Sequence, residues 1–283
     1  MIQTPGRLQV VATPIGNLGD LGARARAALA AADAVVAEDT RRTRALLSAL
    51  GLCRPLISLH AHNESARVPE LIARLTAGAT LALVSDAGTP LLSDPGYELV
   101  HAAIAAAVPV EAIPGPSALT AALACAGLPV SRFCFEGFLP AKASERRAQL
   151  ALLAAEPRTL VFFEAPHRIA TMLADLAAAL GAERQAVVAR ELTKAHETVY
   201  RGTLETLAAR AVREENFQRG ELTVLVEGTP ARSAGADAAL LRRAAQLLAR
   251  ELAPGRAAAL AAQLTGASRS EAYALVLESL QKT

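Results

Sequence analysis

The sequence predicts an α/β protein with two domains and a small helical module at its C-terminal end. Short apolar runs alternate with helical patterns through the first 126 residues, as in a parallel sheet. After a break at Gly127-Leu128-Pro129, further strand patterns follow with fewer helices between them, and the last part of the chain shows only helical patterns. We therefore expect α/β domains over residues 1–126 and 127–228, and a helical module over residues 237–283.

Composition argues against several classes of protein. The 283 residues, 52% of them hydrophobic, suffice for two packed cores. Six Phe, three Tyr and no Trp argue against single-strand nucleic-acid modules built on stacked aromatic rings. The net charge of +2 implies no general polyanion-binding surface. The basic excess lies in the tail, where seven Lys and Arg residues accompany four Asp and Glu residues from Thr229 onward.

Cys53, Cys125 and Cys134 each lie beside apolar residues without metal-like spacing, so we expect buried, reduced thiols in a reducing compartment. The N-terminus lacks the apolar segment of a signal peptide, and no uncharged apolar run of about 18 residues occurs. We therefore expect a cytoplasmic protein with no membrane segment.

In the first domain, a polar loop follows each predicted strand. Strand 8–12 leads into the loop Thr13–Asp20, where Gly16, Gly19 and Gly22 do not form the dinucleotide-binding fingerprint. A glycine-containing turn nevertheless lets the backbone approach a ligand closely.

Strand 34–37 is followed by Glu38 and Asp39, then by a helix whose first turns carry three arginines. The two acids suit the N-terminus of a helix, where a carboxylate caps free backbone N–H groups. Arginines so close together favour phosphate as a partner, because guanidinium binds it in a fork. They are Arg41, Arg42 and Arg44.

Strand 56–59 ends in His60-Ala61-His62-Asn63-Glu64. Two histidines and a glutamate raise the possibility of a metal site, but no further ligand clusters with them. We expect no metal.

The stretch 81–96, LALVSDAGTPLLSDPG, joins a buried strand to two successive polar turns. Strand 109–113 then meets a stiff Pro-Gly-Pro turn, and Ser117 can cap the helix 118–126. Loops at the carboxyl ends of parallel strands are where open α/β sheets bind ligands.

The second domain is expected to contain a mixed sheet, because only some of its strands are separated by long helices. The predicted strands are 132–137, 159–163, 186–191, 197–202 and 221–227. Only three of the 29 basic residues are lysines, and two of these, Lys142 and Lys194, lie in strand-end loops. A lysine can lose its proton where an arginine cannot, so these two can mark a chemical site or lie there by chance. The third is Lys282.

Helical patterns at 237–251, 255–264 and 269–280 end the chain. They fit a small basic module of helix-turn-helix type. A tail that packs on the body or mediates dimerisation fits them equally well.

Nine sequence motifs occur in order over residues 8–228 and resemble those of the tetrapyrrole (corrin/porphyrin) methylase superfamily. They are TPIGNLGDL, EDTRRTRALL, HAHNE, SDAGTPLLSDPGYELV, EAIPGPSALTAAL, FEGFLP, FFEAPHRI, RELTKAHETVYRGT and GELTVLVEG. The resemblance implies two α/β domains of the tetrapyrrole methylase type, with S-adenosylmethionine held in the cleft between them. It implies these cofactor-binding residues: Pro14, Gly16, Asp86, Gly88, Thr89, Ser117, Ala118, Phe163, Glu164 and Leu222.

Within the superfamily, the chain is similar to the branch that methylates ribosomal RNA. Many small-molecule members have Gly-Asp-Pro where this chain has Ser85-Asp86-Ala87, and the variant matches the ribosomal branch. The resemblance implies 2′-O-methylation of a cytidine in 16S rRNA of the small ribosomal subunit by a homodimer. The alternatives are a methyltransferase acting on a tetrapyrrole and a non-catalytic RNA-binding protein on the same fold.

A ribose 2′-hydroxyl is a poor nucleophile, so such an enzyme needs a general base or a strongly orienting hydrogen bond. Our candidates are Lys194, Lys142, Glu38 and Glu164. Lys194 is the first choice, and burial near Arg190 is expected to depress its pKa. The residues expected to contact rRNA phosphates are Arg41, Arg42, Arg44, Arg146 and Arg147.

Overall fold

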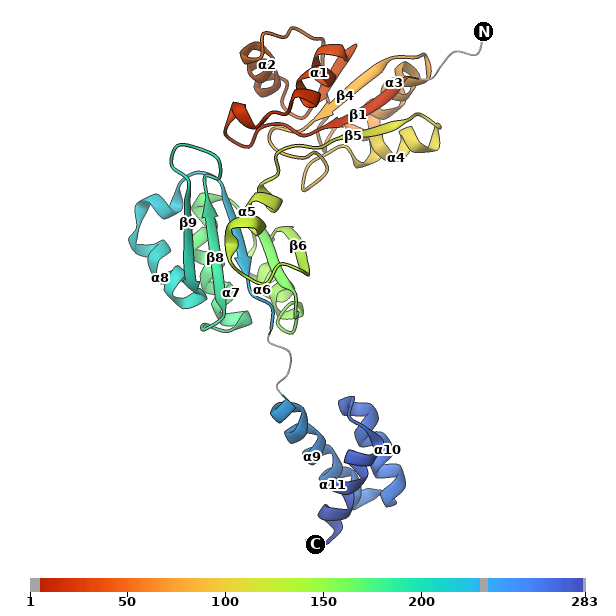
Figure 1. The fold of residues 1–283 in the computed structure, drawn as a ribbon, viewed down its shortest axis with the longest axis vertical. Helices are drawn as coiled ribbons and strands as arrows, with labels where there is room; N and C mark the ends of the chain where they lie inside the picture. Colours follow the sequence, from red (N-terminus) through yellow and green to blue (C-terminus); the bar gives the residue numbers. More distant parts are fainter. Residues whose placement is uncertain (1–5, 230–233, 282–283) are drawn as a thin grey trace. The chain divides into compact units, whose positions relative to one another are not determined.

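The computed structural model describes residues 6–229 and 234–281. The chain divides into two compact units, Met1–Glu227 and Gly228–Thr283. The larger unit contains two five-stranded sheets, and the smaller one contains helices (Figure 1). Part of the linker expected after Gly228, together with Lys282, lies outside the described residues.

The first sheet is parallel, with strand order β3-β2-β4-β1-β5. All five strands were predicted, to within a residue or two at their ends. They are β1 (Arg7–Val11), β2 (Ala34–Ala37), β3 (Leu56–Ser58), β4 (Thr80–Val84) and β5 (Val110–Ile113). Because the strands are parallel, all their carboxyl ends meet at one edge of the sheet.

Helices cover both faces of this sheet, which explains why its strands are apolar throughout. Leu29 of α1 and Leu47 of α2 belong to the hydrophobic cluster on one face, and Leu71 of α3 and Leu99 of α4 to the cluster on the other. The helices are α1 (Ala23–Ala31), α2 (Thr40–Ala49), α3 (Glu64–Thr76) and α4 (Tyr97–Ala105), with a short 3-10 helix η1 (Leu18–Asp20) before α1.

Helix α5 (Ala118–Ala126) packs against the second sheet, although we expected it to belong to the first domain. Its buried side chains Leu119 and Leu123 join a cluster with Val187 and Leu225 of the second sheet. Strand β5 is the last strand of its sheet, so no further parallel strand requires the following helix to return. This packing attaches the two sheets to each other.

The second sheet is mixed, as predicted, with strand order β6-β7-β10-β8-β9. Strands β6 and β7 are parallel, and the other neighbours are antiparallel. The strands are β6 (Phe133–Phe138), β7 (Thr159–Glu164), β8 (Gln185–Arg190), β9 (Thr198–Thr203) and β10 (Leu222–Val226).

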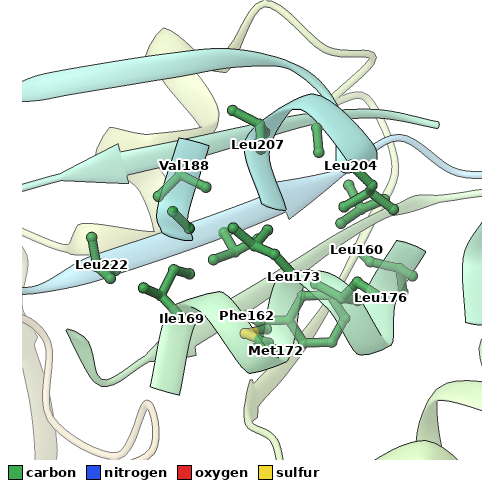
Figure 2. Packing of buried hydrophobic residues seen from close by; sticks show 14 of the residues in the cluster. Leu160, Phe162, Ile169, Met172, Leu173, Leu176, Val188, Leu204, Leu207 and Leu222 are labelled. Atoms are coloured by element: carbon green, nitrogen blue, oxygen red, sulfur yellow. The ribbon is translucent and has the colours of Figure 1, made fainter. Parts of the chain in front are cut away.

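Helices α6 (Ala143–Leu152), α7 (Ile169–Leu180) and α8 (Leu204–Arg213) enclose the largest described core with this sheet. Figure 2 shows Phe162 of β7 beside Met172 and Leu176 of α7. Two 3-10 helices, η2 (Pro166–Arg168) and η3 (Glu215–Gln218), complete the domain.

The C-terminal unit has its own core. Its helices are α9 (Ala234–Glu251), α10 (Pro254–Thr265) and α11 (Arg269–Gln281). Ala245, Ala257, Ala261 and Val276 are fully buried among them. Small alanine side chains let the three helices pack closely.

The cysteine prediction was wrong in one respect. Cys53 is exposed, and Cys125 and Cys134 are only partly buried, although all three are free thiols. Among the described residues, no helix combines the length and the apolar character needed to cross a bilayer.

Candidate active site

Two loops at the carboxyl edge of the first sheet are tied together. Thr13, after β1, and Gly88, after β4, exchange backbone hydrogen bonds of 2.9 and 3.0 Å. The Thr89 hydroxyl donates to the carbonyl oxygen of Pro116 at 3.2 Å, which adds the loop after β5. Three strand-end loops of the first domain therefore form one continuous surface.

The second sheet presents a corresponding edge. Because β10 is antiparallel to both of its neighbours, its first residue, Leu222, pairs with Glu164 at the end of β7 and with Arg190 at the end of β8. The start of one strand thus lies beside the ends of two others.

A cavity of about 440 Å³ lies between the two edges and is lined by residues of both domains. This volume falls within the range of roughly 300–1,000 Å³ that is usual for small-molecule sites. Its lining includes ten of the residues expected to act in catalysis, donor binding or RNA binding. They are Glu38, Arg42, Asp86, Gly88, Thr89, Ser117, Ala118, Phe163, Glu164 and Leu222.

Three carboxyl groups of the first domain share this cavity. Asp86 accepts a hydrogen bond from the backbone N–H of Asp39 at 3.0 Å, and its Oδ2 lies 3.2 Å from Nη1 of Arg42. Burial and the nearby Asp86 and Asp94 carboxylates raise the pKa of Glu38. Burial, together with the Asp86 carboxylate, also raises the pKa of Asp94. This wall stabilises a cation more than an anion.

Glu164 lies at the end of β7, and its side chain is fully buried. Its Oε1 accepts from the backbone N–H of Ala165 at 2.7 Å and lies 3.1 Å from Nε of Arg168. Its Oε2 is buried without a hydrogen-bond partner among the described residues. Burial raises the pKa of Glu164.

The expectation of a depressed pKa for Lys194 was wrong. Its ammonium lies 2.8 Å from Oε1 of Glu191 and 3.3 Å from Oε2 of Glu221. Burial alone lowers the pKa of Lys194, but these two carboxylates outweigh it and raise the pKa above its usual value. Arg190 instead donates to the carbonyl oxygens of Arg219 and His196. Lys194 is therefore held as a cation and lies outside the cavity lining.

Pro14 and Gly16 flank Ile15, which lines the cavity, but do not line it themselves. Gly16 packs on Lys194, because a Cβ at position 16 would lie 2.2 Å from Cγ of that lysine. This close approach brings the first loop of one domain against the second domain. Lys142, the other lysine candidate, is exposed and pairs with Glu145 at 3.0 Å.

Arg41, Arg42 and Arg44 lie exposed on the first turns of α2. Asp39 caps this helix by accepting from the backbone N–H of Arg41 at 2.8 Å and also pairs with the Arg41 guanidinium. The capping interpretation of Asp39 is confirmed, while the three arginine side chains still reach solvent.

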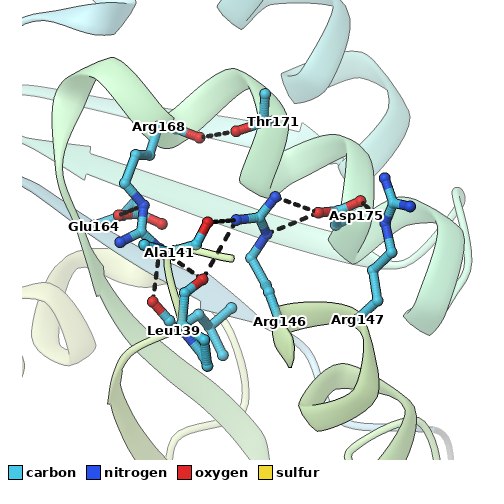
Figure 3. Close-up of polar contacts among 9 residues, drawn as sticks. Leu139, Ala141, Arg146, Arg147, Glu164, Arg168, Thr171 and Asp175 are labelled. Atoms are coloured by element: carbon cyan, nitrogen blue, oxygen red, sulfur yellow. Dashed lines mark hydrogen bonds and ion pairs between the residues drawn. The ribbon is translucent and has the colours of Figure 1, made fainter. Parts of the chain in front are cut away.

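Arg146 contradicts the expectation that it contacts phosphate. Its side chain is only 6% exposed and lies 2.7 Å from Oδ2 of Asp175, which is 8% exposed (Figure 3). Arg147 pairs with the other oxygen of Asp175 at 2.8 Å but remains 68% exposed. The buried arginine joins α6 to α7, and only its neighbour is placed to meet a solvent-borne ligand.

The His60–Glu64 motif serves the fold. Oε1 of Glu64 accepts from the backbone N–H groups of Gly96, Glu98 and Leu99 at 3.0, 2.9 and 3.4 Å. It thus caps α4 from another helix and anchors the end of the 85–96 loop. Over residues 6–229 and 234–281, no group of three or more His, Cys, Asp and Glu side chains could hold a metal.

Sequence reasoning missed several residues that line the cavity. Asp94 and Ser93 belong to the second polar turn of the 81–96 stretch, and that turn could have identified them as cavity residues. Phe138 and Glu221 also line the cavity, each beside a glycine at a strand end. That pattern is too common to have identified them.

Comparison with known proteins agrees with this geometry. Residues 7–208 match the family described as Tetrapyrrole (Corrin/Porphyrin) Methylases. The chain belongs to this methylase family. Residues 223–280 of the methylase match a second family, described as the RsmI C-terminal HTH domain.

Proteins of Xylella fastidiosa and Escherichia coli O157:H7, both named ribosomal RNA small subunit methyltransferase I, are similar to this methylase. They are 55% identical over 275 residues and 47% identical over 273 residues. Each match covers 96% of this chain, and 99% and 95% of the relative, respectively. The fold is shared with a uroporphyrin-III C-methyltransferase of Thermus thermophilus complexed with S-adenyl homocysteine. That match has a TM-score of 0.55 and 21% identity, and covers 78% of this chain and 97% of the other.

Proposed function

We propose that this methylase transfers a methyl group from S-adenosylmethionine to the 2′-hydroxyl of a cytidine in 16S rRNA of the small ribosomal subunit. The observation that carries the proposal is the near-full-length similarity, at 47–55% identity, to proteins named as small-subunit rRNA methyltransferases. The cavity between the two sheets supplies a site of suitable size.

The residues lining the cavity fit the proposed donor. A sulfonium is cationic, and Glu38, Asp86 and Asp94 provide negative charge beside it. Ile15 and Phe163 provide apolar wall for the adenosyl part. We assign donor binding to Asp86, Gly88, Thr89, Ser117, Ala118, Phe163 and Leu222, with Pro14 and Gly16 shaping the first loop from behind. We keep Glu164 in this set because it orders the cavity wall: it accepts a hydrogen bond from the backbone N–H of Ala165 and pairs with Arg168.

When bound, the donor would supply a methyl group to the ribose oxygen and leave as S-adenosylhomocysteine, and a residue of this chain must accept the hydroxyl proton. Of the four predicted catalytic residues, we assign this proton to Glu38. Its carboxylate lines the cavity, is partly exposed, and holds a raised pKa, which suits a base near neutral pH. Lys194 is held as a cation, Lys142 lies outside the cavity lining, and Glu164 is sealed from solvent.

For the RNA, we assign phosphate contacts to Arg41, Arg42 and Arg44, which lie exposed on α2 next to the cavity residue Glu38. Arg147 can add to them, and the basic C-terminal unit contributes affinity. Binding to the small subunit should weaken steeply as salt rises.

We also propose that the protein acts in the cytoplasm as a homodimer, as the family resemblance implies. Light scattering after gel filtration tests the dimer, and a monomeric mass at micromolar concentration would reject it.

The decisive experiment compares labelled-methyl transfer to small ribosomal subunits, naked rRNA and tetrapyrrole precursors. We expect transfer to ribosomal substrate that is lost when the target 2′-hydroxyl is replaced by hydrogen. Transfer to tetrapyrrole alone would reject the proposal, and binding to RNA without transfer would support a non-catalytic protein.

A further inference from the structure

Phe138, at the end of β6, is a large apolar side chain that is 54% exposed and also lines the cavity. Single exposed apolar side chains are common, but this one also lines the cavity, where a bound ligand can cover it. None of the roles assigned above uses it.

A β-bulge directs Phe138 to this position. The register of β6 against β7 shifts between Phe135 and Gly137, and Gly137 has a φ of +63°. Bulges of this kind re-aim the following side chain and are frequent beside active sites. A Cβ at Gly137 would lie 2.9 Å from Oγ of Ser93, so the bulge meets the 85–96 loop of the first domain.

The ring of Phe138 is supported from behind. Its centroid lies 5.7 Å from that of Phe163, whose ring contacts Phe135 edge-on at 4.9 Å. Both supporting rings are more buried than Phe138. A supported ring with one open face can receive a planar ligand without reorganising.

The backbone directly after Phe138 is also held. Nη2 of Arg168 donates to the carbonyl oxygens of Leu139 and Pro140 at 2.6 and 3.2 Å, and Nη1 of Arg146 donates to that of Ala141 at 3.1 Å (Figure 3). Asp175 in turn fixes Arg146. A ring on such a fixed segment loses little conformational entropy when it binds.

We propose that Phe138 is the surface on which the target cytosine base stacks while its ribose is methylated. This inference rests on the proposed function and adds a substrate-positioning residue to it. Proteins that recognise single-stranded RNA stack its exposed bases on aromatic side chains. The donor is assigned to the more enclosed residues, so the open ring is left for the second substrate. A cavity carboxylate can accept from the cytosine amino group.

The test measures kcat/KM for small ribosomal subunits and, separately, the Kd of the methyl donor, on the full-length protein. We expect F138A to lower kcat/KM by about 5- to 150-fold, the range that a stacking free energy of about 1–3 kcal/mol implies. F138W should stay within about threefold of wild type, because it keeps an aromatic face. The donor Kd should change by less than about twofold in both variants, which also shows that they fold.

Phe133 provides a matched control. It lies on the same strand and is 40% exposed, but it does not line the cavity, so F133A should match wild type. Equal kcat/KM for F138A and wild type would overturn the inference alone. A parallel loss of donor affinity in F138A would make Phe138 part of the donor site and overturn it too. A wild type that methylates no ribosomal substrate would reject the proposed function, and this inference with it.

Discussion

At the scale of single residues, three carboxyl groups lie together in the cavity, and two of them, Glu38 and Asp94, have raised pKa values. Burial is the main cause of both raised pKa values, and repulsion from the neighbouring carboxylates adds to it. Nη1 of Arg42 lies 3.2 Å from Oδ2 of Asp86, while Glu38 and Asp94 form no ion pair with any described residue and their pKa values are raised. A cationic donor would relieve the repulsion when it binds.

Glu38→Gln is expected to lower kcat by about 10²- to 10⁴-fold, the usual contribution of a general base. A base acts only when deprotonated, and the pKa of Glu38 is raised, so wild-type activity should fall as pH falls through that raised pKa. The variant should lose this acidic limb, and its donor Kd, measured separately, reports the part of the loss that comes from weaker binding of the cationic donor. Rate profiles between about pH 5 and 9 measure both effects. An unchanged limb in Glu38→Gln would assign the proton to another group.

At the scale of elements, single side chains connect segments that the backbone alone leaves apart. Arg146 and Asp175 join α6 to α7, and both are buried. Burial raises the pKa of Asp175, but the hydrogen bonds from its two arginines outweigh this and lower it. Glu64 joins α3 to the N-terminus of α4 in the same way.

Arg146→Met is expected to lower the free energy of unfolding by about 3–5 kcal/mol, because it leaves the buried Asp175 carboxylate without its main partner. Arg147→Ala, on the same aspartate but with an exposed guanidinium, should cost about 1 kcal/mol or less. Urea unfolding measures both. Equal losses of unfolding free energy in the two variants would mean that burial does not determine how much each ion pair stabilises the protein.

The ion pairs of Asp175 should also make stability depend on pH. Because the pKa of Asp175 is lowered, their contribution to the free energy of unfolding should be full above about pH 5 and lost as pH falls further.

Glu64→Ala is expected to destabilise the protein by about 1–3 kcal/mol, since buried backbone N–H groups of α4 lose their acceptor. The 85–96 loop ends at this cap, so the donor Kd should also rise. Glu64→Gln keeps an acceptor oxygen and should retain most of both properties. Thermal unfolding and donor titration together separate a loss of stability from a loss of the site.

At the scale of the whole molecule, we expect donor binding and part of the substrate affinity to reside in different units. The cavity belongs entirely to Met1–Glu227, and the C-terminal unit has its own core and a sequence net charge of +3 from Thr229 onward. Each unit buries apolar residues of its own, so each should fold independently.

A chain ending at Glu227 is therefore expected to keep the donor Kd of the full-length protein but to bind small ribosomal subunits more weakly. The slope of log K against log salt should become shallower by about 0.7–0.9 for each phosphate that the shorter chain no longer binds. Filter binding at several salt concentrations measures this. Full RNA affinity in the truncated chain would leave the C-terminal unit with a different role.

The sequence by itself determined the strands, the mixed nature of the second sheet and the loops that form the cavity. Apolar runs followed by polar turns encode these locally, and parallel strands necessarily bring such turns to one edge. The loop that contains Asp86 and Thr89 could therefore be placed at the ligand-binding edge of the sheet, and the family resemblance then named these two residues.

Only the tertiary structure decided which side chains are free to act. Lys194 meets Glu191 three positions away and Glu221 27 positions away, and together they turn an expected base into a fixed cation. Arg146 meets Asp175 across 29 positions, which turns an expected phosphate ligand into a core ion pair. Helix α5 packs on the second sheet because its side chains Leu119 and Leu123 bury apolar surface against that sheet. Proton affinity and burial depend on such long-range partners, and a local pattern of residues does not contain them.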